Sequence, residues 1–127
     1  STQPKGKKMA ESLYERLGGT EGINRIASDL VDIHMGNPRI SPRYANSDLK
    51  KVKHGAATFF IAGTGGPNNY EGKDMVSTHS GMNISGEEFL AVLDNSLKAL
   101  DMNGVGQREK EEVLYILYSM KPEIINL

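Results

Sequence analysis

His34, His54 and His79 are the side chains of this 127-residue chain best suited to bind a metal ion. Because the sequence has no cysteine, disulfides, thiolate nucleophiles and iron–sulfur clusters are excluded, and a metal site must use histidine, carboxylate or thioether ligands. The histidines are separated by 20 and 25 residues, unlike the close pairing of a local zinc motif. Each histidine is therefore a separate candidate, with a hydrogen-bonded structural role as the alternative.

His79 lies between a glycine-rich segment, residues 63–72, and the start of an expected helix at Ser85. A neutral imidazole at such a place can present one ring nitrogen to a metal while a neighbouring carbonyl or hydroxyl group holds the other. Turn-forming residues crowd the glycine-rich segment, which we expect to be a loop that joins helices, with only a brief turn at 75–79.

Hydrophobic periodicity predicts the helices that must position these side chains. A hydroxyl three residues before a glutamate, as in Ser12 to Glu15 and Ser85 to Glu88, is typical of a helix start. Apolar residues at three- and four-residue steps then predict one helix capped by Thr20 and a second that begins at Ser47-Asp48 and ends near Gly63. Gly36-Asn37-Pro38 should end the helix after Thr20. Another helix follows Ser85, and the last is marked by Val113, Leu114, Leu117 and Met120.

Composition limits the class of protein. Hydrophobic residues make up 38% and charged residues 24% of a 13.9 kDa chain, which is typical of one folded domain. The 15 basic and 16 acidic residues disfavour nucleic acid as a partner, and no apolar run approaches the roughly 20 residues that span a bilayer. We expect a disordered polar tail at 1–10, an all-α domain at 11–127, and a cytoplasmic location without membrane association.

Two motifs resemble those of the truncated haemoglobins. The segment 12–19, SLYERLGG, resembles the opening helix and Gly-Gly turn of that family. The segment 65–79, GGPNNYEGKDMVSTH, resembles its Gly-Gly-Pro, Tyr-x-Gly and Met-x-x-x-His stretch. With the order of helices, the resemblance covers about residues 12–120 and is closest to the first subgroup of the family.

The resemblance implies a shortened globin in which two antiparallel helix pairs enclose haem b in a two-over-two sandwich. His79 matches the proximal iron ligand of that family. Lys51 and Lys53 lie where an ammonium group could pair with a haem propionate, although a solvated lysine is the more common outcome. The positions that match haem-facing residues, for which ordinary core packing is the alternative, are Tyr44, Leu49, Val52, Phe59, Phe60, Met75, Met82, Ile84 and Val92.

The distal side departs from the family pattern. Most first-subgroup members have a tyrosine on the second helix and a glutamine on the distal helix that donate hydrogen bonds to bound oxygen, but the matching residues here are Val31 and Ala56. Val52 occupies another distal position, and Tyr44 replaces the phenylalanine that wedges the haem. Tyr44, His34 and His54 are the candidate replacements, and His54 is also a candidate sixth iron ligand, one residue from the position used by some relatives.

Reversible binding of oxygen, nitric oxide or carbon monoxide is the function that the resemblance implies, in a monomer or weak homodimer. A nitric oxide dioxygenase or a peroxidase-like enzyme, served by a reductase, is the alternative within the family, and the missing donors weaken the dioxygenase. A helical interaction module that has lost haem is the alternative outside it.

Overall fold

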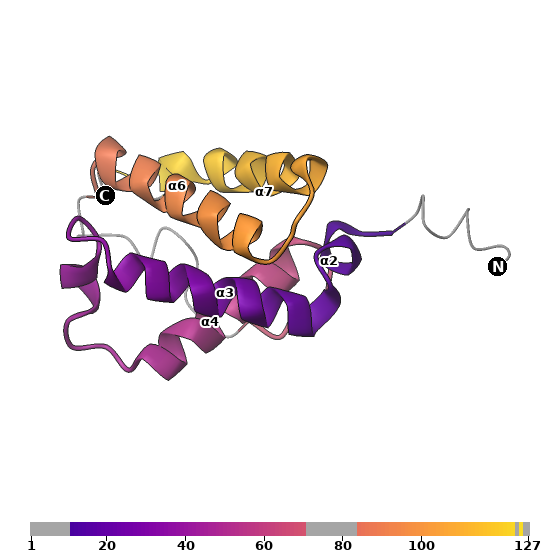
Figure 1. The fold of residues 1–127 in the computed structure, drawn as a ribbon, viewed down its shortest axis with the longest axis horizontal. Helices are drawn as coiled ribbons and strands as arrows, with labels where there is room; N and C mark the ends of the chain where they lie inside the picture. The colour runs from indigo at the N-terminus through magenta and orange to yellow at the C-terminus, as the bar shows by residue number, and fades with distance from the viewer. Residues whose placement is uncertain (1–10, 71–83, 124, 126–127) are drawn as a thin grey trace, which may run out of the picture.

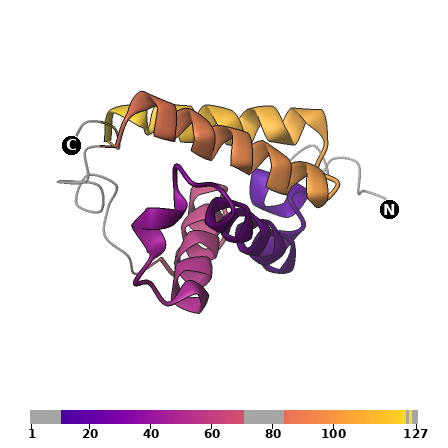
Figure 2. The same cartoon turned by 60° about the vertical axis from the view of Figure 1, so that its left-hand side comes forward.

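The computed structural model describes residues 11–70, 84–123 and 125, and within them the chain forms two layers of paired helices. In Figures 1 and 2 one pair lies across the other, and α3 of the first layer packs on both its partner α4 and on α6 of the second layer. The all-α, two-over-two prediction is confirmed. The four long helices are α3 (Gly19–Met35), α4 (Leu49–Gly63), α6 (Gly86–Met102) and α7 (Gln107–Ser119).

Short elements complete the fold. The four-residue helix α2 (Leu13–Arg16) packs on α3 and α7, and the 3-10 turn η1 (Ser41–Tyr44) connects α3 to α4. A second 3-10 turn, η2 (Lys121–Glu123), follows α7. The expected tail at 1–10 and the expected turn at 75–79 lie outside the described residues.

Most predicted helix boundaries are confirmed. The Ser12–Glu15 and Ser85–Glu88 pairs both form reciprocal capping boxes, in which each side chain accepts a hydrogen bond from the other residue's backbone amide. The Asp48 carboxylate caps α4 by accepting a hydrogen bond from the amide of Lys50. Helix α3 ends at Met35, directly before Gly36-Asn37-Pro38, as expected.

The start of α3 was predicted wrongly. Thr20 was expected to cap this helix, but the N-cap is Gly18 and the helix already begins at Gly19. Both glycines have positive φ, 99° and 68°, which lets the chain turn tightly out of α2 and enter α3 before Thr20 is reached. The Thr20 hydroxyl is hydrogen-bonded instead to the hydroxyl of Tyr14, at 2.7 Å.

Helix α7 extends well before its first apolar marker, Val113. It begins at Gln107 after the N-cap Gly106, and two of the charged residues in its first two turns bind α2 through their side chains. Arg16 of α2 donates hydrogen bonds to Glu109 at 2.8 Å and to both oxygens of Glu112 at 2.6 and 2.8 Å. Hydrogen bonding to Arg16 lowers the pKa of the Glu112 carboxyl.

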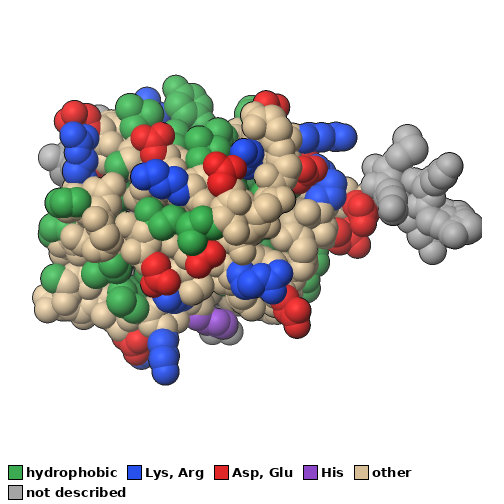
Figure 3. Space-filling model, viewed as in Figure 1, with side chains coloured by type: hydrophobic (Ala, Val, Ile, Leu, Met, Phe, Trp, Pro, Cys, Tyr) green, Lys and Arg blue, Asp and Glu red, His purple; other side chains and the backbone are tan. Residues whose placement is uncertain are grey.

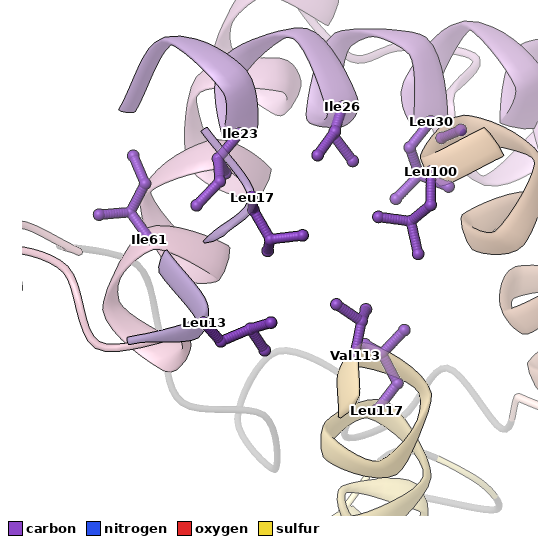
Figure 4. Close-up of a cluster of buried hydrophobic side chains, with 10 residues drawn as sticks. Leu13, Leu17, Ile23, Ile26, Leu30, Ile61, Leu100, Val113 and Leu117 are labelled. Atoms are coloured by element: carbon purple, nitrogen blue, oxygen red, sulfur yellow. The ribbon is translucent and has the colours of Figure 1, made fainter. Parts of the chain in front are cut away.

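The main core lies where α2, α3, α4, α6 and α7 meet, as Figure 4 shows. Helix α3 contributes one apolar side to this core, because residues at three- and four-residue steps share a helix face. The labelled members are Leu13, Leu17, Ile23, Ile26, Leu30, Ile61, Leu100, Val113 and Leu117.

Neither the surface charge nor the described backbone outside the helices suggests a further structural element. On the face shown in Figure 3, acidic and basic side chains are interspersed, in keeping with the nearly balanced charge of the sequence. Within the described ranges there is no strand, only an isolated bridge between Ile84 and Ile125. No described helix combines the length and hydrophobicity that crossing a bilayer requires.

Gly66 should be intolerant of a side chain, because the turn after α4 packs tightly on α2. A Cβ atom at Gly66 would lie 2.4 and 2.6 Å from the Tyr14 ring and 2.8 Å from Ile61. We expect Gly66→Ala to lower the free energy of unfolding by about 1–3 kcal/mol, measured by urea denaturation. The control is Gly63→Ala in the last turn of α4, where a Cβ meets nothing within 4 Å and stability should stay within about 1 kcal/mol of the parent. Equal stability of the two variants would contradict this packing.

Candidate functional site

The predicted site residues come from four described parts of the chain: α3, η1, α4 and the region from residue 84 into α6. Met75, His79 and Met82, including the expected proximal ligand, lie outside the described residues, so their roles stay predictions. Among the residues that the structure does describe, no group of three histidines or carboxylates could hold a metal ion.

Helix α4 has an apolar side that the protein covers only in part. Its two fully buried residues, Ala57 and Ile61, pack toward α3 and the core. Five of its other apolar residues follow a helical repeat and remain partly exposed, and of these Phe60 also packs against the main core. They are Leu49, Val52, Ala56, Phe59 and Phe60, all named as haem-facing or distal positions from the sequence. This side fits a large, flat apolar group.

Aromatic rings line the end of this side of α4. The Phe59 ring lies 5.9 Å from Phe60 and 5.5 Å from Tyr70, with both pairs edge to face at 69° and 72°. Edge-to-face packing is a favoured geometry for such pairs. Tyr70 belongs to the motif read from the sequence, but it was not assigned to the site.

The second layer adds Val92 and Ile84. Val92 is partly exposed on α6, as a residue bordering a bound group would be, whereas Ile84 is buried and forms the bridge to Ile125. The haem-facing role of Ile84 stays a prediction, with core packing as its alternative.

Val31 and Ala56, which stand where most first-subgroup members have hydrogen-bond donors, leave these two positions without a polar side chain. Val31 is only 2% exposed on α3, and Ala56 is partly exposed on α4. Neither side chain can donate a hydrogen bond. A polar contribution on this side must come from other residues.

A buried polar cluster joins α3, η1 and α6. His34 is 5% exposed, and its Nδ1 lies 3.0 Å from the Asn95 Nδ2 atom. The imidazole also stacks against the Tyr44 ring, with centroids 6.3 Å apart and planes within 7° of parallel. Asn95, 2% exposed, was missed from the sequence; the only signal was an amide three residues after Val92 on a helix face expected to be apolar.

Burial sets the protonation of this cluster. Desolvation lowers the pKa of His34 from its ordinary 6.5 to about 4, and burial raises the pKa of the Tyr44 hydroxyl. Near neutral pH both side chains are therefore uncharged. Because the Asn95 amide nitrogen can only donate, Nδ1 of the neutral His34 accepts and the ring proton is on Nε2.

The other basic candidates of α4 lie at the surface. Lys53 Nζ lies 2.8 Å from an Asp32 carboxylate oxygen on α3, so in this structure its ammonium group already has a partner. Lys51 and His54 are exposed. This exposure gives no support to His54 as an iron ligand, and that role stays a prediction.

The turn that carries Tyr44 is tied to the second layer by an ion pair. Arg43 donates hydrogen bonds from Nε and Nη2 to the two carboxylate oxygens of Glu88 at the start of α6, the latter at 2.7 Å. Hydrogen bonding to Arg43 lowers the pKa of Glu88, which also belongs to the Ser85 capping box. One carboxylate thus holds both η1 and the first turn of α6.

His34 should make the fold sensitive to acid. Its pKa is lowered in the folded state, so the unfolded chain binds the proton more tightly and stability falls as the pH drops from about 6.5 to about 4. The loss should reach about 3 kcal/mol below that range. His34→Gln, which does not titrate, should remove most of this slope in urea denaturation followed by circular dichroism. His54→Gln is the control for an exposed histidine on α4, and an unchanged slope in His34→Gln would contradict the prediction.

A protein-family model described as "Bacterial-like globin" matches residues 12–126 of this chain. The sequence is 27% identical over 113 residues to a group 1 truncated haemoglobin of Mycolicibacterium paratuberculosis, covering 89% of this chain and 83% of the relative. The family model thus matches nearly the whole chain.

Solved structures share the fold. The truncated haemoglobin of Tetrahymena pyriformis, in its Fe(III) form, matches with a TM-score of 0.88 and 24% identity over 92% of this chain and 100% of the other. A Synechococcus 2/2 haemoglobin in the cyanomet state, with covalently attached haem, has a TM-score of 0.80 and 24% identity over 87% of this chain and 94% of the other. With a family model that spans both glycine motifs and all four long helices, this chain belongs to the bacterial-like globins and has the two-over-two fold of the truncated haemoglobins.

Proposed function

We propose that this protein binds a diatomic gas, oxygen, nitric oxide or carbon monoxide, reversibly at the iron of haem b held against α4. The family to which the chain belongs implies gas binding at haem. The observation that carries the proposal here is the partly exposed apolar side of α4, from Leu49 to Phe60, which a flat apolar group would cover. His79 supplies the proximal imidazole, as its motif implies.

The protein's contribution is to hold the group and to exclude water. When bound, haem b would supply the iron that binds the gas, and the imidazole of His79 would hold that iron. Val52, Ala56 and Val31 surround the distal side with side chains that neither donate nor accept hydrogen bonds. An apolar environment of this kind keeps water and protons from the ligand, which slows oxidation of ferrous iron.

Tyr44 provides the distal hydroxyl group in this proposal. Unlike His34, it occupies a position that matches a haem-facing residue of the family, and burial keeps its proton on the oxygen because the pKa is raised. His54 is exposed, so closure onto iron would require α4 to rotate or shift. The proposal therefore assigns the distal donor to Tyr44 and leaves the sixth coordination position open to the gas.

An enzymatic role is the weaker candidate. Dioxygenation of nitric oxide requires oxygen to stay bound until nitric oxide arrives, which rests here on Tyr44 alone because Val31 and Ala56 cannot donate, and it also requires electrons from a reductase. A reductase partner, and a monomeric or weakly dimeric state, stay predictions.

Haem binding is tested by an absorption scan of the purified protein, reduced and exposed to carbon monoxide. We expect the sharp porphyrin band of a carbon monoxide complex, and in His79→Ala a loss of haem affinity of at least about tenfold, because the axial ligand is gone. His54→Ala is the matched control, and its ferric spectrum should equal that of the parent. A folded protein that binds no porphyrin would favour the haem-free interaction module instead.

The role of Tyr44 is tested by the rate at which oxygen dissociates. Loss of a hydrogen bond to partly anionic bound oxygen costs about 1.5–3 kcal/mol, so Tyr44→Phe should raise the rate by about 10- to 100-fold. The control is the same substitution at Tyr115 of α7, which is 77% exposed and should leave the rate unchanged. Identical rates for Tyr44→Phe and the parent would exclude this hydroxyl as the donor.

A further inference from the structure

Two members of the polar cluster of Asn95, His34 and Tyr44 are buried, at 2% exposure for Asn95 and 5% for His34. Burying polar groups is costly unless they are hydrogen-bonded, so a buried histidine and amide in contact need a compensating arrangement. Here the three side chains come from α6, α3 and η1, and each contacts the next. The cluster therefore connects the second layer of helices to the turn that carries Tyr44.

One face of α6 carries two residues, Glu88 and Asn95, that each hold the surroundings of Tyr44. Glu88, Val92 and Asn95 are spaced by four and three residues, which places them on the same side of the helix. Glu88 binds Arg43, the residue before Tyr44, and Asn95 binds His34, the residue against which Tyr44 stacks. The backbone and the ring of Tyr44 are thus restrained from the same helix face.

The second ring nitrogen of His34 is not used within the described part of the chain. Nδ1 is occupied by Asn95, whereas no partner is present there for Nε2. Every fully enclosed side-chain nitrogen or oxygen among the described residues has a partner, so Nε2 is not fully enclosed. Because Asn95 donates to Nδ1, the proton of the neutral ring is on Nε2, and the contact with Asn95 fixes this tautomer.

We propose that Asn95 acts through His34 as a positioning residue for Tyr44, so that this three-residue chain replaces the donors missing at Val31 and Ala56. The inference rests on the proposed function and extends it. Asn95 fixes the imidazole plane and its tautomer, the imidazole fixes the plane of the Tyr44 ring, and the ring directs the hydroxyl toward the bound gas. Asn95 and His34 themselves do not touch the gas.

The test is the C–O stretching band of the ferrous carbon monoxide complex, measured by infrared spectroscopy on haem-loaded protein. A donor near the ligand oxygen draws electron density into the C–O antibonding orbital, so loss of the donor moves the band to higher wavenumber. Tyr44→Phe gives the reference shift. Asn95→Leu and His34→Gln should each give at least about half of it, and Asn95→Leu should add nothing in a Tyr44→Phe background, because coupled residues are not additive.

The matched control is Ser96→Ala. Ser96 is as buried as Asn95 and adjacent to it on α6, but its hydroxyl only bonds the Val92 carbonyl of its own helix, at 2.8 Å. Its band should not move. The urea midpoint of unfolding is measured for every variant, so that a band shift caused by lower stability can be distinguished from one caused by loss of the donor. If Asn95→Leu does not fold, His34→Gln carries the test, because it retains an acceptor for Asn95 but has no ring.

The outcomes separate the two proposals. A shift in Tyr44→Phe with none in Asn95→Leu or His34→Gln overturns the positioning role and leaves the proposed function intact. No shift in Tyr44→Phe overturns both the positioning role and the assignment of Tyr44 as donor. Failure of the parent protein to bind haem overturns the proposed function itself and the inference with it.

Discussion

Helix α3 is the element on which both layers depend, because it packs against α4 of its own layer and α6 of the other. Leu30 faces the main core, and Val31, about 100° further round the helix, is also buried but outside that core. A helix that is buried over such a wide arc has little freedom to shift without disturbing both layers. It also carries His34 one turn after Val31, so the polar cluster is placed by the same packing that builds the fold.

Helix α4, in contrast to α3, is buried over only a narrow part of its surface. It is 15 residues long, but only Ala57 and Ile61 are fully buried, while the apolar residues beside them remain partly exposed. Covering apolar surface is worth about 25 cal/mol per Å², so a bound group that covered this side would stabilise the fold as well as serve the chemistry. A bound porphyrin would thus belong to the structure of the first layer, because it would cover apolar side chains that the described part of the protein covers only in part.

Local patterns predicted most of the fold and fewer of the contacts. The capping boxes at Ser12 and Ser85 were readable because both partners lie within one helical turn. Thr20 was misassigned because two glycines with positive φ started the helix earlier, a backbone effect that hydroxyl spacing does not reveal. The pairing of Arg16 with Glu109 and Glu112 joins residues more than 90 positions apart, which no local pattern encodes.

In the candidate site, too, the sequence predicted the positions of residues better than the contacts between them. The site's apolar positions were predictable from helical periodicity and a resemblance between motifs, but its polar partners were not. Asn95 looks like an interruption of an apolar stripe until α3 brings His34 to 3.0 Å from it. Lys53 stays a predicted partner for a propionate, but its contact with Asp32 at 2.8 Å could not be foreseen from the sequence. Substitution of the distal donors by Val31 and Ala56 therefore does not make the distal side uniformly apolar. Instead of lying at Val31 and Ala56, the polar side chains lie where α3, η1 and α6 meet. A change in any of these three elements would therefore alter how the hydroxyl of Tyr44 is held.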